Sequence, residues 1–224
     1  MNSDIDICNM ALGHLSVGKE IVSFSERSEE ASACNRYYDT ARGVILRSFP
    51  WPFALDSEHL ALLQRFDLSD LADSYGYLFA YQYPPRSLRL VNVYDQYAGL
   101  GASTGSRGYG GLIDPERFLT RDYTFPHRVV SGKNGKRIFT NAEDARARFV
   151  DREVPAEHFE EDFSLALSFL AAYLIAPRLG RGDKQLRDEM LREYSLAVSN
   201  ARATGVNEED PEPLAESDLV RSRY

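Results

Sequence analysis

Helical and strand-like patterns of hydrophobic residues divide the chain into three parts. Near the N-terminus, Ser3 and Asp6 have the spacing of a capping box. The apolar positions that follow recur at intervals of three and four: Ile5, Cys8, Leu12 and Leu15. The pattern predicts a short helix that ends near Gly13.

A second helix is expected after a brief connection. Ser25 or Ser28 can cap it, and Glu29 and Glu30 place negative charge at its positive N-terminal end. Its apolar stripe consists of Ala31, Cys34, Tyr38, Ala41 and Ile45. The helix has to end near position 49, because Pro50 disfavours the helical conformation of the residue before it.

The stretch SFPWPFAL, residues 48–55, places the only tryptophan of the chain between two prolines. A bulky indole at such a rigid exit can pack back over the end of the helix with its aromatic neighbours. We therefore interpret Phe49, Trp51 and Phe53 as a structural corner that fixes the direction in which the chain leaves the helix. Stacking of Trp51 on nucleic acid is the less favoured interpretation.

The middle of the chain carries short β-type segments. They lie at 87–94, 127–131, 137–140 and 145–150. Between the second and third, Asn134 and Gly135 form the dipeptide typical of a tight hairpin turn. Residues 99–111 hold six glycines and little that could pack, so we expect a mobile loop there.

Helical signal returns near Pro155 and continues to about Ala176. This segment is apolar on nearly every side, which is typical of a helix that is buried all round. Pro177 and two glycines after it mark a kink or break, and Asp183 can cap a further helix. The apolar face of that helix consists of Leu186, Met190, Tyr194, Ala197 and Ala201. Residues 205–224 hold six acidic residues and two prolines, and are expected to form an extended tail.

These elements predict a mainly α protein with an inserted β region, of the α+β class. Residues 1–80 and 151–204 are expected to pack together as a helical bundle. Residues 81–150 would form a small β-rich domain inserted between them, and residues 205–224 the tail.

Composition narrows the classes of function. The chain has 26 Lys and Arg against 34 Asp and Glu, and the net charge of -8 argues against a protein that gains affinity by neutralising phosphates. Cys8 and Cys34 lie within helical patterns, which fits buried thiols in a reducing compartment better than a secreted disulfide framework. No signal-peptide pattern is found, and the longest apolar run, 165–176, is too short for a membrane span.

Catalytic and cofactor motifs are not found in the sequence. The glycine-rich stretch 99–111 lacks the ending of a P-loop, and the four histidines have no zinc-ligand spacing. Glu157, Glu160, Glu161 and Asp162 could serve as the paired carboxylates of a glycosidase, but acids in a first helical turn more often complement the helix dipole. We therefore expect no enzyme activity, no cofactor and no metal ion.

Positive charge is concentrated around the predicted hairpin. The residues are Arg128, Lys133, Lys136, Arg137, Arg146 and Arg148. Charged side chains often protect exposed strand edges, and this is the simpler interpretation. A contact with an acidic partner or with passing DNA is the alternative.

Four stretches of the chain together resemble a known family. They are DICNMALGHL, ASACNRYYDTARGVILRSFPWPFAL, FAYQYPPRSLRLVNVY and FVDREVPAEHFEEDFSLALSFLAAYLIAPRL. In order and spacing they are similar to the adaptor proteins of short-tailed bacteriophages, also called tail tubular protein A or head-to-tail joining proteins. The landmark residues are Ala31, Tyr38, Asp39, Arg42, Leu46, Trp51, Pro52, Phe53 and Ala54. The SDLVRSR ending extends the likeness over nearly the whole chain.

The resemblance implies a virion structural protein. Members have a helical bundle with an inserted β domain and form a dodecameric ring under the portal vertex of the filled capsid. The ring carries the tail nozzle and tail fibres and helps to retain packaged DNA. The implied partners are copies of the chain itself, the portal protein, and nozzle and fibre proteins, while double-stranded DNA passes through without specific binding. The implied location is the head–tail interface of the virion, after assembly in the host cytoplasm.

Two sets of residues acquire candidate roles from this resemblance. The portal-docking tail would use Leu214, Leu219, Val220, Arg221 and Tyr224. The hairpin that contacts the nozzle or the channel would use Lys133, Asn134, Gly135, Lys136 and Arg137. The apolar helix at 163–176 would bury one side in its own bundle and another against a neighbouring protomer.

Two alternatives stay open. One is a head-completion connector of a long-tailed phage, whose helical core is related; the length of the chain and its β insertion favour the short-tailed assignment. The other is a cell-wall glycosidase of the virion that uses the carboxylates at 157–162.

Overall fold

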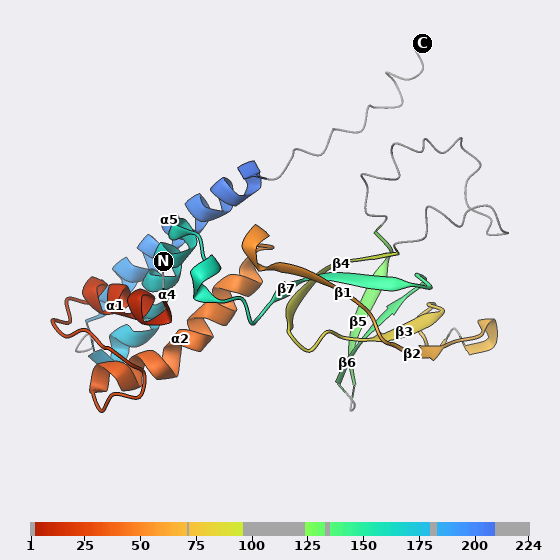
Figure 1. Cartoon of the computed structure of the whole chain (residues 1–224), viewed down its shortest axis with the longest axis horizontal. Helices are drawn as coiled ribbons and strands as arrows, with labels where there is room; N and C mark the ends of the chain where they lie inside the picture. The colour runs from red at the N-terminus through yellow and green to blue at the C-terminus, as the bar shows by residue number, and fades with distance from the viewer. Residues whose placement is uncertain (1–2, 71, 96–123, 133–134, 180–182, 209–224) are drawn as a thin grey trace, which may run out of the picture. The chain divides into compact units, whose positions relative to one another are not determined.

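The structure is a computed structural model, and the chain divides into two compact units (Figure 1). It describes residues 3–70, 72–95, 124–132, 135–179 and 183–208. These residues form four α-helices and two antiparallel sheets, so the predicted α+β class is confirmed. The helical unit comprises Met1–Ala41 and Phe159–Tyr224, and the β-rich unit comprises Arg42–His158.

Helices α1 (Asp4–His14) and α2 (Glu29–Ser48) begin at caps that the sequence predicts. The Asp6 amide donates to Ser3 Oγ at 3.1 Å and the Ser3 amide donates to Asp6 Oδ2 at 3.0 Å, which closes the capping box. At the start of α2, the Ala31 amide donates to Ser28 Oγ at 3.2 Å. The predicted stripe of α2 is buried along its whole length: Ala31, Cys34, Tyr38, Ala41 and Ile45.

A single side chain holds the connection between α1 and α2 against α1. Asn9 Nδ2 donates to the Ile21 carbonyl at 2.9 Å, and the Ile21 amide donates to Asn9 Oδ1 at 2.8 Å. Ile21 is itself buried. The connection is therefore anchored at its middle by two hydrogen bonds and an apolar contact.

Helix α4 (Glu161–Leu179) contacts α1 and also α5 (Lys184–Glu208). Its buried residues run from Phe163 to Ala176 and lie on several sides of the helix, as the sequence predicts. Among the described residues it is the one helix long and apolar enough to cross a membrane, and 56% of that stretch is buried inside the structure. The apolar composition of α4 is also explained by its burial within the helical unit.

Helix α5 begins at the predicted cap. Asp183 Oδ1 accepts from the Gln185 amide at 2.9 Å and from the Leu186 amide at 3.3 Å. Of the predicted apolar face, Met190 and Ala201 are buried and the other members are half-buried. The helix continues to position 208, so residues 205–208 are helical and the prediction of an extended tail from 205 is wrong there. The rest of the predicted tail, 209–224, lies outside the described part of the chain.

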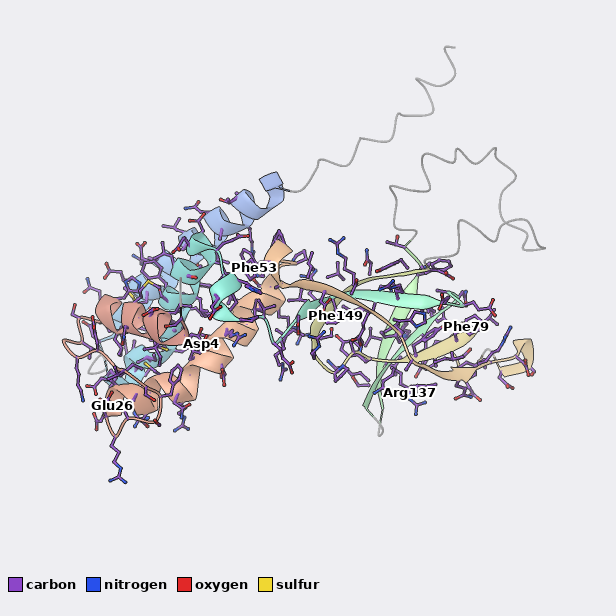
Figure 2. The ribbon with its side chains drawn as sticks, viewed as in Figure 1. Asp4, Glu26, Phe53, Phe79, Arg137 and Phe149 are labelled. Atoms are coloured by element: carbon purple, nitrogen blue, oxygen red, sulfur yellow. The ribbon has the colours of Figure 1, made fainter. Side chains whose placement is uncertain are left out.

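The β-rich unit contains two antiparallel sheets that share one core (Figures 1 and 2). The three-stranded sheet has the order β1 (Leu55–His59), β7 (Ala145–Asp151), β4 (Ser87–Asp95). The four-stranded sheet has the order β2 (Leu62–Arg65), β3 (Phe79–Gln82), β6 (Gly135–Thr140), β5 (His127–Gly132). The large side chains of this core are Leu60, Phe79, Tyr81, Ile138 and Phe149. Strand β1 pairs with β7 from Leu55 opposite Val150, so the chain enters and leaves this sheet at the same end.

The compact β-rich unit spans Arg42–His158, whereas the sequence analysis expected the inserted β-rich domain at 81–150. The four predicted β segments correspond to β4, β5, β6 and β7 and are confirmed. Strands β1 and β2 lie within residues 1–80, which the sequence assigned to the helical part. None of their residues is fully buried, so they lack the alternation that identifies a strand, and they are ordered by pairing with β7 and β3.

Candidate interaction surfaces

The tryptophan corner joins the end of α2 to strand β1. Trp51 is completely buried, and its Nε1 donates to the Ile45 carbonyl at 2.9 Å. That carbonyl belongs to the last turn of α2, where helix carbonyls lack partners within the helix. The rings of Phe49 and Phe53 flank the indole, at centroid distances of 5.1 and 6.1 Å. With no exposed face, the indole cannot stack on a nucleobase in this structure.

Most of the other landmark residues between Ala31 and Ala54 make contacts within the chain. Tyr38 Oη donates to Asp4 Oδ1 at 2.6 Å, and Arg42 donates to the carbonyl oxygens of Val154 and Arg152. Leu46 and Ala54 are buried. These contacts therefore hold the middle and the C-terminal half of α2, and these side chains do not form an exposed binding site.

The predicted hairpin is formed by β5 and β6, with Gly132 opposite Gly135. Lys133 and Asn134, which connect these glycines, lie outside the described residues. Gly135 has φ +97°, a conformation that residues with a side chain rarely adopt. Of the predicted contact residues, Lys136 is exposed and its Nζ lies 5.0 Å from the Tyr83 ring, while Arg137 is half-buried on β6 (Figure 2).

An aromatic and arginine face lies on the outer side of the four-stranded sheet, and the sequence did not predict it. Arg128 stands opposite Phe139 in the β5–β6 register, and its guanidinium lies 4.5 Å above the Tyr75 ring. Tyr75 packs edge-on against Phe139 at 5.2 Å and remains 47% exposed. Its φ of +57° is unusual for a bulky residue, and the Gly76 that follows it also has a positive φ, of +86°.

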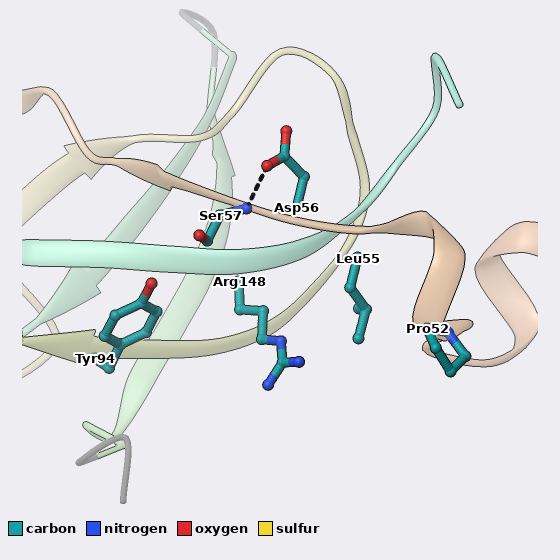
Figure 3. Close-up of a pocket in the computed structure, with 6 residues that line it drawn as sticks. All are labelled: Pro52, Leu55, Asp56, Ser57, Tyr94 and Arg148. Carbon is teal, nitrogen blue, oxygen red and sulfur yellow. Dashed lines mark hydrogen bonds between the residues drawn. The ribbon is translucent and has the colours of Figure 1, made fainter. Parts of the chain in front are cut away.

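A small polar pocket opens on the three-stranded sheet (Figure 3). It is lined by Pro52, Leu55, Asp56, Ser57, Tyr94 and Arg148. Arg86 Nη2 donates to Asp56 Oδ2 at 2.6 Å and Arg86 Nη1 donates to Asp151 Oδ2 at 3.0 Å, so the pocket's one carboxylate is neutralised. The bond to Asp56 raises the pKa of Arg86. Arg148 is exposed and has no ion pair among the described residues. The residues that line the pocket offer no pair of nucleophile and base.

A serine and a histidine meet in the helical unit, at His14 of α1 and Ser168 of α4. His14 Nε2 lies 3.0 Å from Ser168 Oγ, and the imidazole stacks on Phe169 at 4.1 Å. The Ser168 hydroxyl donates to the Leu165 carbonyl at 2.7 Å, so the imidazole is the donor to Ser168. Burial lowers the pKa of His14. Because Ser168 is completely buried and its proton is already engaged, the pair is a packing contact and not a nucleophilic dyad.

The carboxylates considered for glycosidase chemistry lie on different elements of the chain. Glu161 and Asp162 occupy the first turn of α4, where they complement the helix dipole. Thr204 Oγ1 donates to Asp162 Oδ2 at 3.3 Å. Glu157 belongs to a short 3₁₀ turn of the β-rich unit. Within the described residues, no group of three His, Cys, Asp or Glu side chains could hold a metal ion.

Residues 209–224 of the predicted tail 205–224, which include all of its portal-docking residues, lie outside the described residues, and so does the glycine-rich loop at 99–111. Searches of models of known protein families and of curated proteins gave no match for this chain.

Proposed function

We propose that the chain is a virion structural protein that forms an adaptor ring between the portal vertex and the tail nozzle of a short-tailed bacteriophage. One observation carries the proposal. Helices from both ends of the chain lie in one unit, and the residues between them form a separate β-rich unit. This is the arrangement expected from the adaptor family that the sequence resembles. In the proposal, α1, α2, α4 and α5 constitute the helical bundle of that family.

Exposed apolar side chains of the helical unit support self-association. Leu165 on α4 is 42% exposed, and Leu191 and Leu196 on α5 are 40% and 62% exposed. A closed ring requires that one surface of each protomer bind a different surface of the next. These leucines would take part in that contact, and the ring would have twelve copies.

The β-rich unit would supply the contacts below the ring. Its candidate surfaces are the β5–β6 hairpin and the aromatic and arginine face with Tyr75 and Arg128. Tyrosine and arginine are the residue types enriched at the centres of protein interfaces. A nozzle protein is thus the proposed partner of this unit, and the acidic balance of the chain would let DNA pass without binding.

The decisive experiment mixes the protein with its portal protein and images the product by electron microscopy. The isolated protein should be monomeric in light scattering, and rings should form only on the portal. The double substitution Leu191→Glu and Leu196→Glu should abolish ring formation. Val22→Glu is the matched control, because Val22 is 87% exposed and belongs to the α1–α2 connection and not to α4 or α5. A protein that never binds portal would refute the proposal.

The tail and the glycosidase alternative have separate tests. Deleting residues 209–224, which follow α5, should leave the thermal unfolding transition unchanged and abolish portal docking. Undiminished docking would reject the assignment of the tail. Clearing of a peptidoglycan suspension that is lost in Glu160→Gln or Glu161→Gln would favour the enzyme.

A further inference from the structure

The four-stranded sheet of the β-rich unit has two edge strands, β2 and β5 (Figure 1). Within the described residues, no strand and no backbone hydrogen bond is paired with the outer side of either edge. By contrast, the edge strand β4 of the other sheet is bridged on its outer side, where Tyr94 pairs with Thr124. Open backbone groups at a sheet edge can pair with a strand of another chain, so β2 and β5 are both candidates for such a contact.

One row of side chains crosses the four-stranded sheet from edge to edge on its core side. Leu62 of β2 stands opposite Tyr81 of β3. Tyr81 stands opposite Ile138 of β6, and Ile138 stands opposite Val129 of β5. The two middle members of the row are buried in the core of the unit, whereas Leu62 is 52% and Val129 is 40% exposed. The row is therefore apolar throughout, and its two end members are only partly covered.

The strand directions indicate which kind of partner continues the sheet. Neighbouring strands are antiparallel throughout, and the sheet has four of them, so β2 and β5 run in opposite directions. When a second copy of the sheet is placed beside the first in the same orientation, its β2 lies antiparallel to β5 of the first. The alternation then continues across the boundary and across that of each further copy. A repeated head-to-tail contact of this kind is the type that a ring requires.

We propose that β5 of one protomer pairs antiparallel with β2 of the next, so that Val129 stands opposite Leu62 of the neighbouring copy. The partner at each edge is thus a second copy of this chain, and the inference rests on the adaptor ring proposed above. The pairing continues the apolar row from one protomer into the next, and burial of both side chains adds to the hydrogen bonds between the strands. In a closed ring, no edge of this sheet is left unpaired.

The length and the charges of the edge strands determine the strength of this contact. Strand β2 has four residues and a bulge between Leu62 and Gln64, and short, bulged edge strands pair weakly. One contact should therefore be too weak to hold two isolated protomers together, whereas a ring repeats it at every boundary. Positive charge near the row is compensated, since Arg65 lies 3.6 Å from Glu143 and Arg128 stacks on an aromatic ring on the other face of the sheet.

Cross-linking of two variants with one added cysteine each tests the pairing. Leu62→Cys and Val129→Cys chains are mixed in equal amounts, assembled on the portal protein and treated with a short bis-maleimide. The mixture should give a cross-linked dimer in a denaturing gel, and neither variant alone should, because each boundary joins one β5 to one β2. A chain with both substitutions should give a ladder of multimers. The unmodified chain is the control, since its Cys8 and Cys34 are completely buried.

The outcomes distinguish failure of the strand pairing from failure of the adaptor role. Rings that form without a cross-link in the mixture would overturn the pairing and leave the adaptor role intact. A cross-link in either variant alone would show a two-fold contact between like edges, which also contradicts the pairing. If no ring forms on the portal, the adaptor role is refuted and the pairing with it.

A charge exchange tests the same boundary without a cross-linker. Val129→Lys alone and Leu62→Lys alone should each lower ring assembly several-fold, because charged side chains at a sheet edge oppose pairing. Val129→Lys combined with Leu62→Glu places opposite charges across each boundary and should restore assembly. Val22→Lys is the control and should assemble like the unmodified chain. Circular dichroism shows whether each variant is folded, and the cross-link stays decisive if one is not. Equal assembly of the single and the combined variants would contradict the pairing.

Discussion

The cores of the two units are built from side chains of different size. Buried residues of the helical unit include many small ones, among them Cys8, Ala31, Cys34, Ala166 and Ala171. The core of the β-rich unit depends on large aromatic rings such as Phe79, Tyr81 and Phe149, and its entry corner on Trp51. Small residues let helices approach closely and leave no room for larger ones, whereas a buried ring leaves a large cavity when removed. The helical unit should therefore be more sensitive to overpacking, and the β-rich unit to truncation.

Truncation of the corner should have the largest effect. Trp51→Ala removes a fully buried indole and its hydrogen bond to the Ile45 carbonyl, and should lower the free energy of unfolding by about 3–5 kcal/mol. Urea unfolding followed by circular dichroism measures the loss. Trp51→Phe keeps an aromatic ring between Phe49 and Phe53 and should cost clearly less. Equal losses would show that ring packing contributes little at this corner.

Overpacking of the helical unit should have the next largest effect. Ala171 is completely buried in α4, so Ala171→Leu has to displace neighbouring side chains and should cost about 1–3 kcal/mol. Thermal unfolding of the variant measures this. The control is Leu191→Ala at an exposed position of α5, which should change stability by less than about 0.5 kcal/mol. A stabilised Ala171→Leu protein would indicate unfilled space near α4.

Substitution at the hairpin should have a moderate effect that depends on backbone conformation alone. Gly135 has φ +97° and open space where a Cβ would stand, so Gly135→Ala should cost about 1–2 kcal/mol through strain. At Gly132 a Cβ would meet only the Gly135 carbonyl at 3.9 Å, and φ is not positive. Gly132→Ala should therefore be nearly neutral in urea unfolding. A ranking of the two in the opposite order would contradict the hairpin geometry.

The smallest expected effect is a pH dependence of the free energy of unfolding that arises from His14 in the helical unit. Burial lowers the pKa of His14 below its ordinary value of 6.5, so the unfolded chain binds this proton more readily than the folded one. The contribution of His14 is complete above pH 6.5 and is lost as the pH falls through 6.5 towards the lower folded pKa. Urea unfolding at several pH values measures the slope, and His14→Gln should reduce it. An unchanged slope would assign the acid sensitivity to other groups.

The two units also differ in how much of them sequence analysis could predict. Local signals were sufficient for the Ser3 and Asp183 caps and for the stripe of α2, because capping and helical periodicity act over a few residues. Strand β1 was missed because its partner β7 lies far along the chain, and β2 because all of its residues are exposed and show no alternation. The corner was predicted from its prolines.

For the candidate surfaces too, features with a local sequence signal were predicted, and features that depend on contacts between distant segments were not. The position of the hairpin was predicted, since glycines mark it locally. The contact of Arg128 with Tyr75 was not, because it depends on strand register and on an unusual backbone angle at Tyr75. The roles of the tail residues stay predictions.

The pairing of β1 with β7 determines how the β-rich unit would respond to mechanical load. Leu55 opposite Val150 stands at the end where the chain enters and leaves this sheet. Tension applied to these two points would pull the strands apart like a zipper, rupturing one bridge after another from Leu55 towards His59, instead of shearing all of them together. The unit should therefore yield at low force.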